Sequence, residues 1–214
     1  MRRFIALWYV VSMKRVFDLT ASLTVLFLLS PLFLLLAILI AIKMGRPVIF
    51  SQQRPGLNGN IFSIYKFRSM KEIFDANGEP LPNAERLTSI GRFIRKTSLD
   101  ELPGLWNVIR GDMSLVGPRP LKVEYLELYS KDQARRHNVR PGITGWAQVN
   151  GRNSLNWQER FKLDLWYVDN QSFFLDLKIL LLTFMKVLTS KDIEYQGDEI
   201  QARFIGNGDM NEGQ

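Results

Sequence analysis

The chain has 214 residues, of which 46% are hydrophobic, so it can form one globular domain with an appended element but not two full domains. With no cysteine and a single histidine, His137, it excludes a disulfide framework, thiol catalysis and histidine-rich metal sites, which leaves oxygen ligands and hence Mg2+ for any catalytic metal. The formal net charge of +7 predicts an anionic partner: nucleic acid, an anionic membrane surface or a phosphorylated substrate.

The first predicted element is an amphipathic N-terminal extension, residues 1 to 13. It mixes arginines with Phe4, Trp8 and Tyr9. This mixture is typical of a helix that lies at a membrane interface. The role of the extension stays open.

Residues 14 to 45 contain the most apolar part of the chain. From Leu19 to Ile42 there is no charged residue, and at about 1.5 Å per residue this stretch could cross a hydrocarbon core of about 30 Å. A buried helix of a soluble protein is the alternative, but a domain this small has little interior to cover such a helix on all sides. A cleaved signal peptide is disfavoured because the stretch is too long and no small-residue cleavage site follows it.

A re-entrant membrane helix, broken at Ser30 and Pro31, is the predicted form of this segment. Proline removes a backbone hydrogen bond, and the serine hydroxyl can satisfy a freed carbonyl. Basic residues flank both ends, including Lys14 and Arg15 before the segment and Lys43 after it. An ordinary span should have asymmetric flanks, so we expect both ends on the same anionic face; a kinked spanning helix is the alternative.

Residues 46 to 190 are expected to form a compact cytoplasmic catalytic domain, followed by a polar and mobile tail, residues 191 to 214. The predicted fold class is α+β and predominantly helical. Its expected elements are a β-hairpin of strands at 47–56 and 61–70, helices at 84–98, 101–111 and 121–137, a glycine-containing loop at 140–153, an amphipathic helix at 154–170, and an apolar segment at 173–188 that either packs as core or lies on the membrane.

Asp100 and Glu101 are adjacent acids in "SLDELPGLW". The structural interpretation is a capping box, with Ser98 as N-cap and Glu101 three residues later. Pro103 counts against it, because a residue before proline is pushed out of the helical region, so Leu102 should be extended or bent and the box should not close cleanly. The two acids are then expected just ahead of a helix N-terminus.

The chemistry that suits adjacent acids is a division of labour. A glycosidase pair needs carboxylates facing each other about 5 Å or more apart, which neighbours on one bend do not readily supply. One carboxylate can instead attack an electrophile while the other holds a metal. An aspartate is ionised at neutral pH and needs no base to act as a nucleophile.

Several basic residues could serve such a reaction. Lys66 and Arg68 alternate in "YKFRSM" and so should share one face of a strand. Arg95 precedes the acids by five residues. Arg119 stands between two prolines in "GPRP", and a rigidly held arginine suits bidentate phosphate binding. Each of the others could equally be a solvated surface charge.

The motifs "KRVFDL", "RPG" at 54–56, "YKFRSM", "SLDELPGLWNVIRGDMSLVGPRP" and "RPGITGWAQVNGRN" together resemble the bacterial sugar transferase family, the monotopic phosphoglycosyl transferases. The resemblance covers about residues 14 to 188. The length resembles the small form of the family, which consists of little more than the catalytic domain. The motifs are most similar to those of the enzyme that starts lipid-linked glycans for bacterial protein N-glycosylation. The family transfers a sugar 1-phosphate from a UDP-sugar to undecaprenyl phosphate at the cytoplasmic face of the inner membrane and releases UMP.

The resemblance also implies roles for individual residues. Asp100 would be the nucleophile on the sugar-bearing phosphorus, giving a covalent phosphosugar enzyme, and Glu101 a Mg2+-associated carboxylate. The other implied residues are Lys66, Arg95 and Arg119 for phosphate charge, Asp176 as a weaker candidate for the same pocket, Arg140 and Arg152 for the nucleotide, and Ser30 and Pro31 for the re-entrant break.

The expected partners are a UDP-sugar, undecaprenyl phosphate and inner-membrane phospholipid, with no nucleic acid; a homodimer is left open. Two other classes remain. A membrane-anchored basic domain that binds acidic lipid or a protein without catalysis predicts that Asp100 and Glu101 can be neutralised with little loss. A tethered nucleic-acid-binding protein predicts steep salt-dependent binding to oligonucleotides. The identity of the sugar cannot be read from the sequence.

Overall fold

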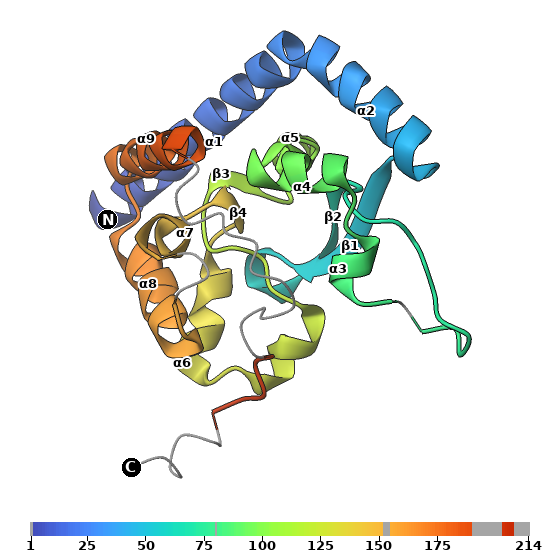
Figure 1. Ribbon diagram of the computed structural model, residues 1–214. Helices are drawn as coiled ribbons and strands as arrows, with labels where there is room; N and C mark the ends of the chain where they lie inside the picture. The colour runs from blue at the N-terminus through green and yellow to red at the C-terminus, as the bar shows by residue number, and fades with distance from the viewer. Residues whose placement is uncertain (1, 80, 152–154, 190–202, 208–214) are drawn as a thin grey trace.

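The fold is mixed helix and strand with helices predominant, as predicted (Figure 1). The computed structural model describes residues 2–79, 81–151, 155–189 and 203–207. Its α-helices are α1 (Arg2–Leu28), α2 (Ser30–Met44), α3 (Asn83–Arg86), α4 (Ser89–Lys96), α5 (Gly104–Arg110), α6 (Lys131–Ala134), α7 (Trp146–Asn150), α8 (Trp157–Asn170) and α9 (Phe173–Thr189). The strands are β1 (Ile49–Pro55), β2 (Ile61–Phe67), β3 (Ser114–Val116) and β4 (Gly142–Thr144), and the 3-10 helices are η1 (Leu57–Gly59), η2 (Leu99–Glu101), η3 (Val123–Leu128) and η4 (Arg135–Asn138).

The chain bends sharply between α1 and α2, at the predicted break. The segments Met13–Leu28 and Ser30–Met44 meet at 63° and form a bent arm above the rest of the molecule (Figure 1). Pro31 lies in the first turn of α2, where its missing N–H leaves the carbonyl of Phe27 without a helical donor. The Ser30 hydroxyl donates to that carbonyl at 2.8 Å, so serine and proline act together as the sequence predicts.

The bent pair presents apolar side chains to its surroundings. Phe27 is 79% exposed and Ile42 is 71% exposed, which excludes the interpretation of a helix buried on all sides. Within the described residues no single helix is both long and apolar enough to cross a membrane, but the two segments of the bent pair meet that test together. Helix α1 continues from Arg2 without interruption past Met13, so the N-terminal extension and the apolar segment share one helix.

Basic side chains attach the bent pair to the domain beneath it. Lys14 of α1 donates to the carbonyl of Val116 at 3.0 Å, and Arg15 donates to the carbonyls of Val108 at 2.5 Å and Ile109 at 2.9 Å. In α2, Leu36 and Ile40 are buried in a cluster with Phe67 and Ile94. Both arms are therefore anchored to elements that follow them in the chain.

Strands β1 and β2 form the predicted antiparallel hairpin, with Ile49 opposite Phe67 and Pro55 opposite Ile61. The strand β2 ends at Phe67, so Arg68 does not alternate with Lys66 on one strand face as expected. Instead the Arg68 guanidinium donates to the carbonyls of Met44 and Gly45, because these carbonyls at the end of α2 have no helical donor. The shared-face prediction is wrong for Arg68.

The buried Asn107 fixes α5 against the hairpin. Its side-chain oxygen accepts from the Tyr65 N–H at 3.1 Å, and its amide nitrogen donates to the Ser63 carbonyl at 2.8 Å. The side chain thus occupies a place that a third strand would otherwise take beside β2. This contact sets the position of β2 relative to the turn that carries Asp100 and Glu101.

Strands β3 and β4 make a short parallel pair that the sequence analysis does not anticipate. Ser114 lies opposite Gly142 and Val116 opposite Thr144, and the Gly117 N–H donates to the Thr144 carbonyl at 2.9 Å. A Cβ atom on Gly142 would lie 2.1 Å from the Gly117 nitrogen, so the two backbones touch directly. The pair fixes the loop that leads through Pro118 to Arg119.

Two predicted helices are divided. The expected helix over 84–98 becomes α3 and α4, because Thr88 caps α4 by accepting from the Gly91 N–H at 3.0 Å. The expected helix over 121–137 becomes η3, α6 and η4, because Ser130 and Gln133 form a capping box that starts α6. Local side-chain caps therefore override a continuous apolar period.

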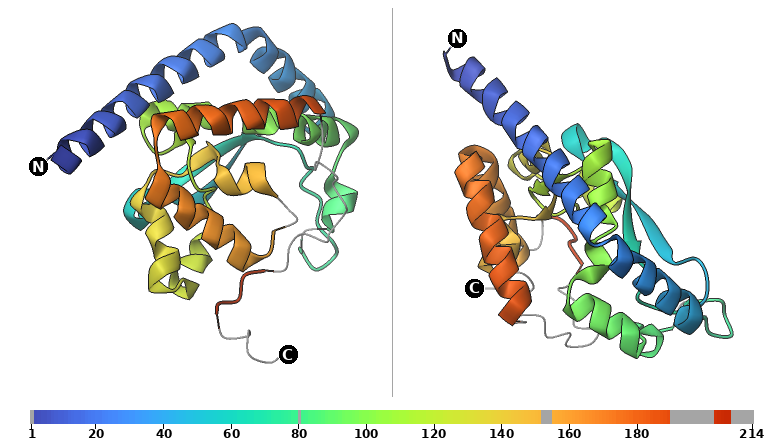
Figure 2. Two further views of the ribbon diagram at one scale, coloured as in Figure 1. Left: turned by 90° about the vertical axis from the view of Figure 1, so that its left-hand side faces the viewer. Right: turned by 90° about the horizontal axis from the view of Figure 1, so that it is seen from above.

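The apolar segment at 173–188 forms most of α9, which lies beneath the bent pair (Figure 2). Ile179 is fully buried, whereas Phe174, Leu181 and Phe184 are exposed. One face of α9 therefore packs as core, and the opposite face is open.

Part of the polar tail is packed rather than mobile. Phe204 is buried and contacts the rings of Tyr125, Trp157 and Phe161. Arg203 pairs with Glu124 at 2.6 Å. The prediction of a mobile tail is wrong for 203–207; the rest of it, 191–202 and 208–214, lies outside the described residues.

Candidate active site

A pocket of about 570 Å³ opens between the hairpin, α4, η2, the Arg119 loop and α7 with α8. Its charged lining is dominated by cations. The basic lining residues are Arg54, Lys66, Arg68, Arg86, Arg92, Arg95, Lys96, Arg119 and Arg160, and the acidic ones are Glu72, Asp100, Glu101 and Asp164. A pocket with this excess of cations suits a ligand that carries phosphate groups.

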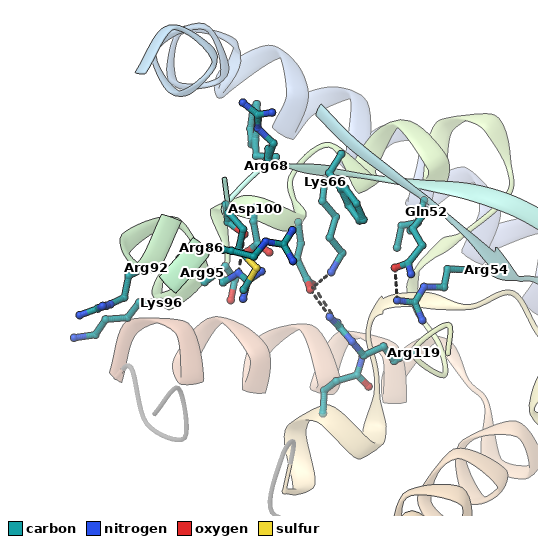
Figure 3. A pocket seen from close by; sticks show the side chains of 18 of the residues that line it. Gln52, Arg54, Lys66, Arg68, Arg86, Arg92, Arg95, Lys96, Asp100 and Arg119 are labelled. Carbon is teal, nitrogen blue, oxygen red and sulfur yellow. Dashed lines mark hydrogen bonds and ion pairs between the residues drawn. The ribbon is translucent and has the colours of Figure 1, made fainter. Parts of the chain in front are cut away.

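Glu101 stands at the centre of an ion-pair cluster with Lys66 and Arg119, and Figure 3 shows these two cations pointing toward each other. Its Oε1 accepts from Lys66 Nζ at 2.9 Å and from Arg119 Nη2 at 2.6 Å, and its Oε2 lies 3.3 Å from Arg119 Nη1. The hairpin supplies the lysine and the Pro-flanked loop supplies the arginine. The structure thus brings together three residues that the sequence analysis selected.

The turn before α5 holds Asp100 and Glu101 without a capping box. Ser98 has a left-handed backbone (φ 56°) and its side chain makes no capping bond, while the Glu101 carboxylate is committed to Lys66 and Arg119. The acids lie just ahead of α5, as predicted. Leu102 is not extended but lies in the turn with helical dihedral angles (φ −55°, ψ −39°), so it takes the bent form of the two that were predicted. Here the 3-10 turn runs on into α5 and outweighs the usual effect of the following proline.

Electrostatics give the two acids different properties. Burial, and then the charge of Glu101, raises the pKa of Asp100. Burial would raise the pKa of Glu101 too, but the charges of Arg119 and Lys66 outweigh it and hold that pKa well below its usual range. Burial lowers the pKa of Lys66, and the Arg119 charge adds to this effect. Glu101 therefore stays ionised, and Asp100 is the acid with the more reactive carboxylate.

Asp100 lies within electrostatic reach of Lys66, Arg119 and Arg95, and Figure 3 shows it between Arg95 and Lys66. The Arg95 Nε donates to the Ser69 hydroxyl at 2.7 Å. The predicted phosphate-binding residues therefore surround the predicted nucleophile. Arg68 lines the same pocket, although its guanidinium is bonded to the end of α2.

A buried ion pair supports the backbone of Arg119. Arg136 and Asp164 are each 2% exposed and lie 2.7 Å apart. The same Nη2 of Arg136 donates to the Arg119 carbonyl at 2.7 Å. This support comes from η4 and α8, which follow far along the chain from the turn that carries Asp100 and Glu101.

Two predicted site residues, Asp176 and Arg140, are not in this pocket, and a third lies outside the described residues. Asp176 accepts from Lys14 at 2.5 Å and from the Tyr167 hydroxyl at 2.7 Å, so it bonds α9 to α1 and α8 instead of lining the pocket. Arg140 donates to the Gly111 carbonyl at 2.9 Å and does not line the pocket. Arg152 lies outside the described residues.

The acids can supply only part of a metal site. Among the described residues no group of three or more His, Cys, Asp or Glu side chains could hold a metal ion. Mg2+ is commonly bound through one or two carboxylates together with substrate phosphates. Asp100 and Glu101 fit that arrangement, with Glu101 as the carboxylate whose charge is fixed.

The sequence analysis missed several residues that build the site. Asp164, Arg160, Gln148 and Arg54 line the pocket, and Asn107 positions β2 from inside α5. Asn107 carried a signal, since asparagine is unfavourable within a helix and so indicates a specific bond. The others depend on which distant segments meet, and no local pattern reveals that.

Comparison with known proteins gives a consistent family. The family model described as "Bacterial sugar transferase" matches residues 9–190. "Uncharacterized sugar transferase EpsL" of Bacillus subtilis is 55% identical over 198 residues, which are 92% of this chain and 98% of that relative.

Two relatives with more specific names are longer proteins. "Undecaprenyl-phosphate galactose phosphotransferase" of Salmonella typhimurium is 43% identical over 86% of this chain and 42% of its own length. "UDP-glucose:undecaprenyl-phosphate glucose-1-phosphate transferase" of Escherichia coli is 40% identical over 84% of this chain and 41% of its own length. The chain thus spans about two fifths of these larger relatives.

Proposed function

This chain belongs to the bacterial sugar transferase family, and from that premise we propose that it transfers a sugar 1-phosphate from a UDP-sugar to undecaprenyl phosphate, releasing UMP. The observation that carries the proposal is Asp100, a half-buried carboxylate in a cation-rich pocket beside an acid already paired with Lys66 and Arg119. The names of the longer relatives, which specify undecaprenyl phosphate with galactose or glucose, support the same substrate class.

The proposed reaction has two displacements at one phosphorus. An Asp100 oxygen attacks the sugar-bearing phosphorus of the UDP-sugar, and the bond to the bridging oxygen breaks, so that UMP leaves with the electron pair. A phosphate oxygen of undecaprenyl phosphate then attacks the same phosphorus and displaces Asp100. The product is undecaprenyl diphosphate sugar, and the free carboxylate is restored.

The surrounding residues serve this chemistry through charge and position. Lys66 and Arg119 offset charge on the diphosphate, and Arg95 does so on the other side of Asp100. Glu101 orients Lys66 and Arg119 and would hold Mg2+ together with phosphate oxygens. Bound Mg2+ would neutralise phosphate charge and assist departure of UMP.

The bent pair of α1 and α2 would provide the membrane attachment. Its exposed apolar surface, its 63° bend and the basic residues at both ends support a re-entrant insertion. We propose a monotopic protein of the bacterial inner membrane, with the catalytic domain on the cytoplasmic face among phospholipid headgroups. The acceptor lipid can then meet Asp100 without leaving the bilayer.

The test of the reaction is UMP release by the full chain in nanodiscs with undecaprenyl phosphate, Mg2+ and a panel of UDP-sugars. The panel includes UDP-glucose, UDP-galactose and N-acetylated hexosamine donors, since the likeness to the N-glycosylation initiator stays a prediction. Asp100→Asn should abolish UMP release and the mass increase of one phosphosugar on the protein. Asp132→Asn, at an exposed acid of α6, is the matched control. Full activity of Asp100→Asn would favour the non-catalytic membrane-anchored alternative.

The test of topology uses the absence of native cysteine. Two single-cysteine variants, Met13→Cys and Lys43→Cys, place a thiol near each end of the bent pair. Each is labelled with a membrane-impermeant maleimide in inside-out vesicles. A re-entrant segment exposes both positions on the cytoplasmic side. Labelling of only one of them would instead indicate a kinked spanning helix.

A further inference from the structure

Gln148 of α7 has a buried side-chain amide with no hydrogen-bond partner. Neither its Nε2 nor its Oε1 is paired, and within the described residues it is the one side-chain amide that leaves both polar atoms buried and unpaired. Buried polar groups are nearly always hydrogen-bonded, so an exception needs a physical explanation. A primary amide offers two donor hydrogens and an acceptor oxygen, and none of these is bonded at Gln148.

The position of Gln148 supplies that explanation. Its side chain lines the main pocket and also an adjoining cavity of about 140 Å³ beneath α9. The two spaces share Ser98, Glu101 and Arg119 with Gln148. The unpaired amide therefore lies at the inner wall of the proposed active site, on the side where Arg119 pairs with Glu101.

Two other glutamines among the described residues, Gln52 and Gln133, are paired. Gln52 accepts from Arg54 at 2.6 Å. Gln133 is buried, accepts from the Ser130 N–H at 2.9 Å and donates to Asn207 at 2.7 Å. The fold thus satisfies a buried glutamine where its role is structural, and it leaves the amide free at Gln148.

The backbone around Gln148 holds the amide in a fixed place relative to Arg119. Gly145 precedes α7, and a Cβ atom there would lie 2.2 Å from the Gly117 carbonyl oxygen. Gly117 is two residues before Arg119, and its N–H bonds to Thr144. The segments that carry Gln148 and Arg119 are therefore in direct backbone contact, which is the preorganisation that a recognition residue needs.

The chemistry of the amide identifies the kind of group it would bind. Phosphate charge is already served by Lys66, Arg95 and Arg119, and a neutral amide adds no charge to that task. A primary amide pairs best with a neutral group that presents both a donor and an acceptor. In a UDP-sugar such groups are the imide edge of uracil and the hydroxyl or acylamino groups of the sugar.

We propose that Gln148 is a recognition residue for the UDP-sugar and hydrogen-bonds one of these neutral groups. The inference rests on the proposed function and adds to it a residue that discriminates among donors. A site built to hydrogen-bond a substrate group rejects an analogue that lacks it more strongly than an apolar pocket can, because its own polar atoms are then left unpaired.

The test is equilibrium binding of UMP, UDP-glucose and UDP-galactose to Gln148→Met, in an Asp100→Asn background that prevents turnover. Loss of the bonds from the amide should weaken binding about 10-fold. The unfolding temperature should stay equal or rise, because methionine of similar size removes an unpaired buried polar group. Gln133→Met is the matched control: it breaks a paired buried amide and should lower the unfolding temperature while leaving binding unchanged.

The probes separate the two sources of the recognised group. Equal weakening of UMP and of the UDP-sugars assigns Gln148 to uracil, whereas weakening of a UDP-sugar alone assigns it to the sugar. Binding of every probe within two-fold of the parent overturns the inference, as does a fall in unfolding temperature like that of Gln133→Met. Failure of the proposed function is a separate result, namely no UMP release by the wild-type chain with any donor.

Discussion

Replacing Arg136 by methionine should destabilise the protein strongly, although the residue does not line the pocket. Arg136 and Asp164 form a pair at 2.7 Å with each side chain 2% exposed. Removing one partner leaves an uncompensated buried charge, which costs about 3–5 kcal/mol. At about 2–4 °C per kcal/mol for a chain of this size, the unfolding temperature should fall by about 6–20 °C. Asp164→Leu should cause a similar fall.

The double variant Arg136→Met with Asp164→Leu separates stability from positioning. Replacing both charges by apolar side chains should restore most of the lost stability. UMP release should stay about 10-fold or more below wild type, because the Arg119 carbonyl still lacks its donor and the pocket has also lost the Asp164 carboxylate that lines it. The assays are thermal unfolding and UMP release in the same nanodiscs. Single variants that unfold within 2 °C of wild type would refute the argument from burial, and a double variant with full activity would refute the argument for positioning.

Three further predictions concern other parts of the structure. Glu101→Gln removes the negative charge that helps to raise the pKa of Asp100. Because the proposed reaction needs ionised Asp100 and is lost as pH falls through its pKa, the acid limb of the kcat/KM profile should move to lower pH. An acid limb that does not move would contradict the electrostatic coupling of the two acids. Lys14→Met removes the cation paired with the buried Asp176 at 2.5 Å and should cost about 3 kcal/mol, measured by denaturant unfolding, with wild-type stability as the contrary result. Gly142→Ala places a Cβ atom 2.1 Å from a backbone nitrogen and should reduce both folded yield and activity more than Gly104→Ala, whose added Cβ would meet no atom closer than 3.8 Å.

The hairpin, the bend and the central cluster could be predicted because their determinants are local. Ser30 and Pro31 act on one carbonyl within a single turn, and Lys66 belongs to a strand with a clear alternation. Arg119 is held between two prolines whose geometry is intrinsic. These residues carry their structural meaning in neighbouring positions of the chain.

The remaining parts of the site depend on partners that meet only in the folded chain. Asp176 was assigned to the pocket, but the structure places it with Lys14, 162 residues away in sequence. Asp164 has no local pattern that distinguishes it from a surface acid, yet it is buried against Arg136. Gln148 was singled out because its side-chain amide has no hydrogen-bond partner, and this can be seen only in the structure.

The attachment of the bent pair has a mechanical consequence. Helix α1 is bonded through Lys14 to β3 and through Arg15 to the end of α5, while α2 is bonded through Arg68 to the chain just after β2. The two helices are thus both fixed to the domain, with no linker between the bent pair and the domain. The distance between Asp100 and the bend that joins α1 to α2 is therefore set by the fold. With the insertion proposed above, a lipid phosphate would meet Asp100 at one fixed depth, and the protein would have to tilt as a whole to adapt to a bilayer of different thickness.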